Sequence, residues 1–198
     1  MKPLGEQFAK PEGWIGKGVG WFMNFENKEL NRWTTSFLDI QPEDHILEIG
    51  FGPGRGIKHV LNTYHPCVFY GIDPSEPMVE AALKRLKSHR DGQVCLMQGE
   101  AKELLHFNSK LDKVYAVNNI TYWEEPIRIL EHIRSMMSEG GRIAITLCPH
   151  EEGADDDTTE VLGGQIQSFL MKAGFQHVEI FKKHTDPNDT CCVVGINQ

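Results

Sequence analysis

Apolar positions along this chain alternate between two spacings. Short continuous apolar runs, such as Ile46–Ile49, are typical of buried strands. Other segments place apolar residues three or four apart, as Met78, Ala82 and Leu86 do, which is the spacing of one face of a helix. Because strand and helix patterns follow one another along the chain, we expect an α/β fold in which a parallel sheet carries helices on both faces.

Seven strands and five helices are expected from these patterns. The strands are near Ile46–Ile49, Val68–Ile72, Val94–Gln98, Lys113–Val117, Arg142–Leu147, Val178–Phe181 and Cys191–Ile196. The helices are Asn27–Phe37, Arg55–Leu61, Pro77–Ser88, Glu125–Met137 and Thr158–Ala173. Glycines at Gly140-Gly141 and Gly174 are expected to end the last two helices. The acidic run Glu151–Asp157 is expected to be an exposed loop.

Length and charge limit the classes of function. The 198 residues suit one domain with a single core and leave no room for a second substrate domain. With a net charge of −8 and a pI near 5.6, the chain has no broad basic footprint for duplex nucleic acid. A small molecule is therefore the expected partner, and nucleic acid is not expected.

The cysteines and the apolar segments of the chain indicate in which cellular compartment the protein is expected. Five scattered cysteines without a C-x-x-C pair indicate a reducing environment and give no zinc framework. Met1–Lys10 lacks the apolar stretch of a signal peptide, and no window approaches the ~20 apolar residues of a membrane span. The sequence therefore predicts a cytoplasmic protein without a membrane span.

The run from Ile46 to Gly56, ILEIGFGPGRG, carries the strongest functional signal. A buried strand ends near Glu48 and continues into alternating glycines, which let the backbone approach a ligand closely. The spacing is E-x-G-x-G-x-G, not the G-x-G-x-x-G of dinucleotide sites, and no lysine followed by Ser or Thr is present to bind a triphosphate. The alternative interpretation is a tight structural turn without a ligand.

An acid at the strand end suits a ligand with positive charge, such as the ammonium and sulfonium groups of S-adenosylmethionine. At this point the chain resembles the class I S-adenosylmethionine-dependent methyltransferases, whose first motif coincides with Glu48–Gly56. The resemblance covers Asp44–Gln198. It implies a Rossmann-like, mostly parallel seven-stranded sheet whose last strand is antiparallel, with S-adenosyl-L-methionine as cofactor. The first-motif residues that it assigns to the cofactor are Glu48, Gly50, Phe51, Gly52 and Gly54.

Ligands of open parallel sheets lie beyond the carboxyl ends of the strands, so the other strand ends carry the remaining candidates. Asp73 lies 19 residues after Gly54, close to the ~20-residue offset at which an acid reaches ribose hydroxyls. An Asp before Pro also commonly starts a turn and caps a helix, which is the alternative role. The resemblance places adenine against Pro74, Ser75 and Met78, although Met78 equally suits the core.

The third strand end, Gln98-Gly99-Glu100-Ala101, resembles the Gly-Asp-Ala segment of the family. There the acid meets the exocyclic amine of adenine, and Glu100 stands in its place with a longer side chain. The backbone N–H of Ala101 is expected to face a ring nitrogen. A solvent-exposed glutamate in a loop is the alternative.

The fourth strand end supplies amides and aromatic rings. The resemblance assigns Asn118 to the cofactor and makes Asn119 and Tyr122 candidates for the catalytic or acceptor site. Tyr122 and Trp123 offer aromatic faces to a sulfonium or a substrate ring, or simply pack at a helix start. The segment lacks the D/N-P-P-Y/F pattern, so methylation of exocyclic base or amide nitrogens is disfavoured.

The fifth strand end contributes His150, a candidate base because imidazole titrates near neutrality. The remaining histidines show no metal-ligand spacing, and no carboxylate cluster suggests a magnesium site, so no metal is expected. The catalytic residue is therefore left open among Asn119, Tyr122 and His150.

Residues 1–43 precede the family core and form an N-terminal arm with one helix. Between Lys10 and Phe25 the arm combines glycines with Trp14, Trp21 and Phe22, as a lid over cofactor and substrate would. The alternative is an arm packed permanently on the core. We expect residues 44–198 to form the cofactor-binding core of a single domain.

Methyl transfer to a small-molecule acceptor is the function that these residues indicate. Such a transfer needs alignment and desolvation more than it needs a particular catalytic group. The short segment after the fifth strand, Pro149–Asp157, also permits a non-catalytic module that binds S-adenosylmethionine or its demethylated product. An aminopropyl transferase shares the fold, but Asn118-Asn119 do not supply the acids expected for a polyamine.

Overall fold

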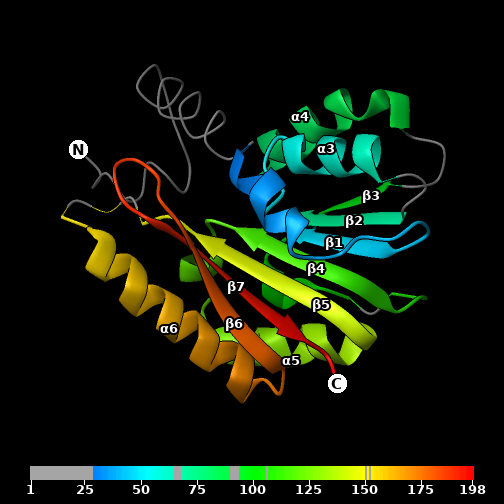
Figure 1. Ribbon diagram of the computed structural model, residues 1–198. Helices are drawn as coiled ribbons and strands as arrows, with labels where there is room; N and C mark the ends of the chain where they lie inside the picture. The colour runs from blue at the N-terminus through cyan, green and yellow to red at the C-terminus, as the bar shows by residue number, and fades with distance from the viewer. Residues whose placement is uncertain (1–28, 65–67, 90–93, 106, 150, 152) are drawn as a thin grey trace.

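The computed structural model of the chain describes residues 29–64, 68–89, 94–105, 107–149, 151 and 153–198 (Figure 1). These residues contain a seven-stranded sheet in the order β3-β2-β1-β4-β5-β7-β6. The strands are β1 (His45–Ile49), β2 (Val68–Asp73), β3 (Val94–Gln98), β4 (Leu111–Val117), β5 (Met137–Leu147), β6 (Gln176–Lys183) and β7 (Thr190–Ile196).

Strand direction matches the expected sheet. The pairs β1–β2, β2–β3, β1–β4 and β4–β5 are parallel, whereas β7 is antiparallel to both of its neighbours, β5 and β6. All seven expected strands are present, and the Rossmann-like α/β class is confirmed.

The five expected helices are present as well. They are a helix over residues 29–36, α3 (Arg55–Thr63), α4 (Glu76–Arg85), α5 (Pro126–Met136) and α6 (Asp156–Lys172). Gly174 follows α6 with φ 93°, as expected for a C-terminal glycine. The expectation for Gly140 was wrong: α5 ends at Met136, and Gly140 lies inside β5, where φ is 78° beside an irregularity in the β4–β5 register.

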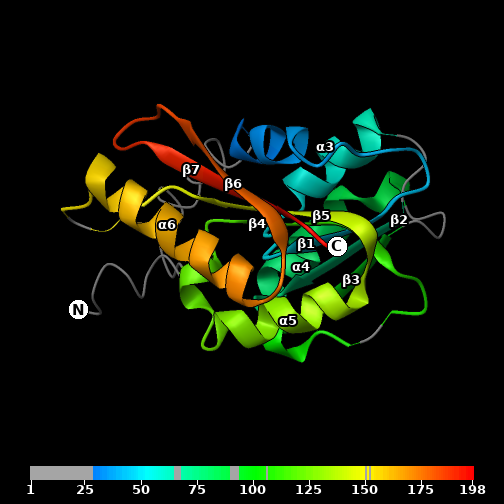
Figure 2. The same cartoon turned by 60° about the horizontal axis from the view of Figure 1, so that its bottom comes forward.

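Helices cover both faces of the sheet (Figures 1 and 2). The helix over residues 29–36, α3 and α4 share one apolar core with the sheet, and α5 and α6 share the other. The side chains of β1 point alternately into the two cores. Ile46 belongs to the first core, whereas Leu47 and Ile49 belong to the second. Glu48, two residues after Ile46, therefore faces the α3 side.

The strand order places a topological switch point at the centre of the sheet. From β1 the chain runs outward through β2 to β3, then returns to the other side of β1 as β4. In open parallel sheets a ligand crevice forms beyond the carboxyl ends of the strands at such a point. The loops after β1, β2 and β4, which carry most of the sequence candidates, meet there.

Candidate functional site

The glycine loop after β1 has the backbone conformations that its sequence predicts. Gly50, Gly52 and Gly54 have φ values of 70°, 52° and 74°, a region that L side chains rarely adopt. A Cβ on Gly52 would meet no atom of the described residues within 4 Å, so this glycine borders open space in that part of the chain. A Cβ on Gly50 would lie 2.4 Å from Asn119 Nδ2, and one on Gly54 would lie 2.9 Å from Ala82 Cβ. The loop is therefore packed at both ends and open in the middle.

Asp73, at the end of β2, joins this loop to the next strand. Its Oδ2 accepts the Gly52 N–H at 2.7 Å and its Oδ1 accepts the Ser75 N–H at 2.9 Å. Burial raises the pKa of Asp73, and the two N–H donors partly oppose this effect. Each carboxylate oxygen retains acceptor capacity after one bond, so the geometry fits a pair of ribose hydroxyls beside the open middle of the loop.

Glu48 lies beneath the loop, not at its surface. The residue is 2% exposed, and its Oε1 and the Tyr115 hydroxyl crowd the position that a Cβ on Gly56 would take, at 2.7 and 3.0 Å. The Tyr115 hydroxyl influences the pKa of Glu48, but neither that hydroxyl nor Glu48 Oε2 makes a hydrogen bond of good geometry within the described residues.

The charge state of Glu48 differs from the negative charge that we expected from the sequence. Burial raises its pKa to about 8, and the nearby charge of Asp73 adds to this, against opposing effects of Tyr115 and the Ile57 N–H. The side chain is therefore mostly protonated at neutral pH. The contact of Glu48 with the cofactor stays a prediction, and so does that of Asp73, whose carboxylate accepts two backbone N–H groups at the neighbouring strand end.

Two other first-motif residues, Phe51 and Gly54, pack the loop against β2 and α4. The Phe51 side chain is buried against β2, where a Cβ on Gly71 would lie 2.6 Å from Phe51 Cδ1. Gly54 is the N-cap of α3 and packs on α4. Both residues shape the loop from below.

The start of α4 borders the same space. Pro74 is exposed, Ser75 is the half-buried N-cap of α4 with no side-chain capping bond, and Met78 is half-buried. The Met78 N–H donates to the Ser75 carbonyl at 2.9 Å. The Ser75 hydroxyl is therefore not used to cap its helix.

Glu100 precedes the short helix η2 (Ala101–Glu103). Its carboxylate is exposed and lies 3.0 Å from Lys102 Nζ, which also contacts Glu124 Oε2 at 2.9 Å. Ala101 is buried. It lines a pocket of about 190 Å³ between η2 and the start of α5. The other residues that line this pocket are Lys102, Glu124, Glu125, Arg128, Ile129 and His132. Lys102 thus joins the predicted adenine-side acid to the segment before α5.

The two asparagines after β4 make different contacts. Asn118 has φ 55°, and its Oδ1 accepts the Cys148 N–H at 2.8 Å, which ties the ends of β4 and β5 together. Asn119 Nδ2 donates to the Ile49 carbonyl at 2.7 Å and to the Val117 carbonyl at 3.2 Å. Both amide hydrogens of Asn119 are therefore used within the protein, which suits a positioning role better than a catalytic one.

The aromatic candidates lie on the short helix η3 (Ile120–Tyr122) and just after it. The Trp123 indole donates to Asn119 Oδ1 at 3.1 Å and packs half-buried against the α5 side core. Tyr122 is 59% exposed, which is unusual for a ring of its size. Tyr122 is thus available to a ligand, while Trp123 is held in place by Asn119.

Four candidates fall outside the described residues: Trp14, Trp21 and Phe22 of the arm, and His150 after β5. The lid and the histidine base therefore stay predictions. Among the described residues, no group of three or more His, Cys, Asp or Glu side chains could hold a metal ion, and no helix is long and apolar enough to cross a membrane.

Sequence reasoning did not find Tyr115 and Lys102, two further residues of this region. Tyr115 pairs with Glu48 across the β1–β4 ladder, a register that becomes visible only when the strands are aligned. Lys102 sits next to the predicted acid, so an i, i+2 charge pair at Glu100 was the one available signal.

Comparison with known proteins agrees with this arrangement. A family model described as a methyltransferase domain matches residues 47–143. The uncharacterized methyltransferase YdaC of Bacillus subtilis is 35% identical over 177 residues, which cover 89% of this chain and 96% of YdaC. Phosphoethanolamine N-methyltransferase 2 of Caenorhabditis elegans is 27% identical over 153 residues, 72% of this chain and 35% of that protein.

Solved structures show the same fold. Phosphoethanolamine N-methyltransferase 2 of Haemonchus contortus, in complex with S-adenosyl-L-methionine, superposes with a TM-score of 0.69 at 16% identity, over 85% of this chain and 52% of that one. A seven-stranded sheet with a glycine loop after β1 and an acid at the end of β2 that binds this loop is the arrangement of a class I methyltransferase fold. This chain belongs to the S-adenosylmethionine-dependent methyltransferase family, and S-adenosyl-L-methionine is its cofactor.

Proposed function

We propose that this methyltransferase methylates a small-molecule acceptor by in-line displacement at the carboxyl edge of the sheet. The observation that carries the proposal is the pair of aromatic rings at the carboxyl end of β4, where Asn119 holds the Trp123 indole and Tyr122 presents an exposed ring. The short connection between β5 and α6, from Cys148 to Asp155, adds no further domain, which suits a small acceptor as well as a non-catalytic binding module. The names of the nematode relatives, which specify the small acceptor phosphoethanolamine, support it.

Several residues would hold the cofactor. Asp73 would accept the ribose hydroxyls beside Gly52, and Glu100 with the Ala101 N–H would meet adenine. Ser75 and Met78 would line the adenine side, and Asn118 the methionine side. When bound, S-adenosyl-L-methionine supplies a methyl group on a positively charged sulfur.

The chain's own contribution is orientation. Asn119 fixes the Trp123 ring by a hydrogen bond to its indole, and Tyr122 presents an exposed ring at the same strand end. Holding an acceptor in line with the methyl group can supply effective molarities on the order of 10⁵–10⁸ M in favourable systems. The glycine-rich part of the arm, between Lys10 and Phe25, would close the site against water, and its protection from limited proteolysis on cofactor binding tests that role.

An acceptor screen tests the proposal. Full-length protein with S-adenosyl-L-methionine is offered amines, phenols, carboxylic acids and thiols of low molecular weight, and in parallel transfer RNA and unfolded protein. Release of S-adenosylhomocysteine is measured. We expect turnover with members of the small-molecule set. Turnover only with a macromolecule would contradict the proposal, and cofactor binding without any turnover would favour a sensor.

A further inference from the structure

Arg85 is anchored to the outer side of the glycine loop. It is the last residue of α4, and its Nη1 donates to the carbonyl oxygen of Pro53. The end of α4 is fixed against the loop by packing, because a Cβ on Gly54 would lie 2.9 Å from Ala82 Cβ and 3.5 Å from Leu86 Cδ1. The Arg85 guanidinium is therefore held close to the first residue of α3.

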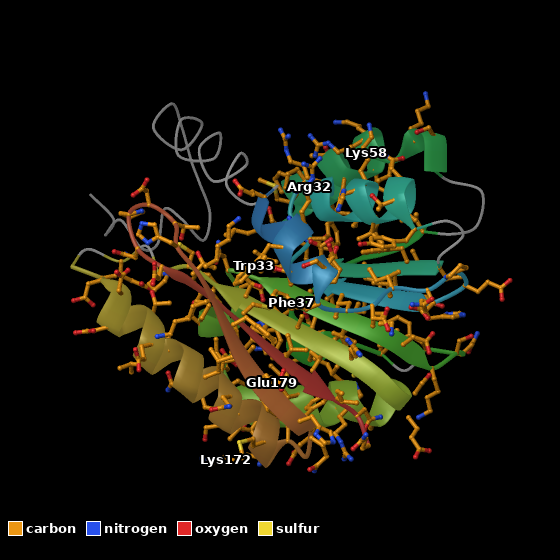
Figure 3. The ribbon with its side chains drawn as sticks, viewed as in Figure 1. Arg32, Trp33, Phe37, Lys58, Lys172 and Glu179 are labelled. Atoms are coloured by element: carbon orange, nitrogen blue, oxygen red, sulfur yellow. The ribbon has the colours of Figure 1, made fainter. Side chains whose placement is uncertain are left out.

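That first residue is Arg55, two positions after Pro53. Arg55 is exposed, and Lys58 follows on the same face of α3 because residues three apart are neighbours on a helix. Figure 3 shows Lys58 on the outer side of α3. Partial burial lowers the pKa of Arg85, and the charge of Arg55 lowers it further, as expected for two neighbouring guanidinium groups.

The three cations have no acidic partner in the described part of the chain. No ion pair joins Arg55, Lys58 or Arg85 to a carboxylate there, although other lysines of the chain are paired in this way, Lys102 and Lys182 among them. The α3 sequence from Arg55 to Thr63 contains no acid, in a chain with 28 acidic and 20 basic residues.

Neighbouring cations without a counter-charge repel each other, and an anion between them relieves that repulsion. Guanidinium groups present pairs of N–H donors in a planar fork that matches phosphate oxygens, whereas an ammonium group acts as a point charge. Because Arg85 is already oriented by Pro53 and partly withdrawn from water, an anion bound there meets a preorganised donor.

We propose that Arg55, Arg85 and Lys58 form a binding site for a phosphate monoester at the outer side of the glycine loop. The phosphate belongs to a small metabolite or to a lipid headgroup, which share this chemistry. The site lies outside the predicted contacts of the cofactor, and it goes beyond the proposed function because it makes no use of methyl transfer.

Calorimetry of the full-length protein at low ionic strength tests the site, with inorganic phosphate and phosphoethanolamine as probes. We expect saturable binding that weakens with added salt. Arg55→Gln and Arg85→Gln should each weaken it by roughly tenfold, the scale of one charge-assisted contact. The control is Lys84→Gln with Lys87→Gln, which removes more charge from the end of α4 and its following turn, and it should bind the probes as the wild type does.

Three further measurements separate the outcomes. Circular dichroism and S-adenosylhomocysteine affinity should be unchanged in Arg55→Gln, whose side chain is exposed, so loss of phosphate binding there is not loss of the fold or of the cofactor site. Co-sedimentation with phosphatidic acid vesicles, against phosphatidylcholine vesicles, identifies a headgroup as the source. The proposal is overturned by absence of saturable phosphate binding, by full binding in Arg55→Gln, or by an equal loss in the lysine control.

Discussion

The backbone N–H of Gly52 donates to Asp73 Oδ2 at 2.7 Å. This bond joins the glycine loop after β1 to the acid at the end of β2, two segments that were predicted separately as parts of one cofactor site. The carboxylate of Asp73 thus fixes the open part of the loop, and we predict that the same carboxylate accepts the ribose hydroxyls of the cofactor. Its removal is expected to affect the shape of the site as well as one contact.

Replacing Asp73 with Asn tests that relationship. The amide keeps the size of the side chain but removes the charge and one acceptor oxygen. We expect the affinity for S-adenosylhomocysteine to fall by about 1.5–3 kcal/mol, the range for hydrogen bonds to a charged group. Calorimetry measures this. Asp112→Asn is the matched control, because Asp112 also accepts two bonds, from the His45 N–H and the Ser138 hydroxyl, but at the opposite edge of the sheet. Equal losses in both variants would argue against a specific role of Asp73.

Glu48 should make stability depend on pH. Because burial raises its folded-state pKa to about 8 from an ordinary 4.5, the folded protein holds this proton more tightly than the unfolded chain. The stabilising contribution is complete below pH 4.5 and is lost as the pH rises through 8.

Glu48→Gln removes the titration and keeps a neutral side chain of similar shape. The free energy of unfolding of the wild type, minus that of Glu48→Gln, should fall by about 1.4 kcal/mol per pH unit between pH 4.5 and 8. Urea denaturation at a series of pH values gives both curves. A difference that does not change with pH would show that Glu48 ionises normally in the folded state.

Gly50 and Gly52 are expected to respond differently to the same substitution. Alanine at either position adopts a left-handed conformation at a cost of about 1–2 kcal/mol. At Gly50 the new methyl group also collides with Asn119 Nδ2, so Gly50→Ala should destabilise the fold more than Gly52→Ala. At Gly52 the methyl group enters open space beside Asp73, so cofactor affinity should suffer more than stability. Thermal unfolding and calorimetry on both variants separate the effects, and the reverse order would refute this assignment.

Asn119→Ala removes three hydrogen bonds at once. It frees the Ile49 and Val117 carbonyls and the Trp123 indole, so we expect a loss of about 1.5–4.5 kcal/mol of stability, at roughly 0.5–1.5 kcal/mol per bond. The Trp123 fluorescence spectrum should also change. Asn108→Ala, at an exposed asparagine, is the control and should change neither quantity. An unchanged spectrum in Asn119→Ala would mean that Asn119 does not position the ring.

Much of the fold was predictable because it depends on local patterns. Apolar runs of strand type gave all seven strands, and helical spacing gave the five helices. The end of α5 was not predictable from Gly140, because the chain enters β5 directly at Met137 and pairing with β4 decides where the helix ends. Helix boundaries depend on such tertiary pairing as well as on glycine.

In the candidate site, too, some features were predictable from the sequence and others were set by tertiary packing. Spacing alone identified the loop of Gly50, Gly52 and Gly54, whose left-handed conformations favour glycine wherever the loop occurs. Spacing could not say that Phe51 points into the core, that Asn119 donates both amide hydrogens within the protein, or that Arg85 reaches back to Pro53. Those facts depend on how strands and helices far apart in sequence are packed.

Glu48 shows the division most clearly. By itself, the sequence determined that a carboxyl group lies near the end of β1, two residues before the first glycine of the loop, and it determined the class of fold and cofactor that this motif accompanies. Only the tertiary structure decided that the carboxyl group lies under α3 against Tyr115. The reason is physical: the charge of a carboxyl group depends on its access to water, and access to water is set by the packing of α3 and β4 over β1.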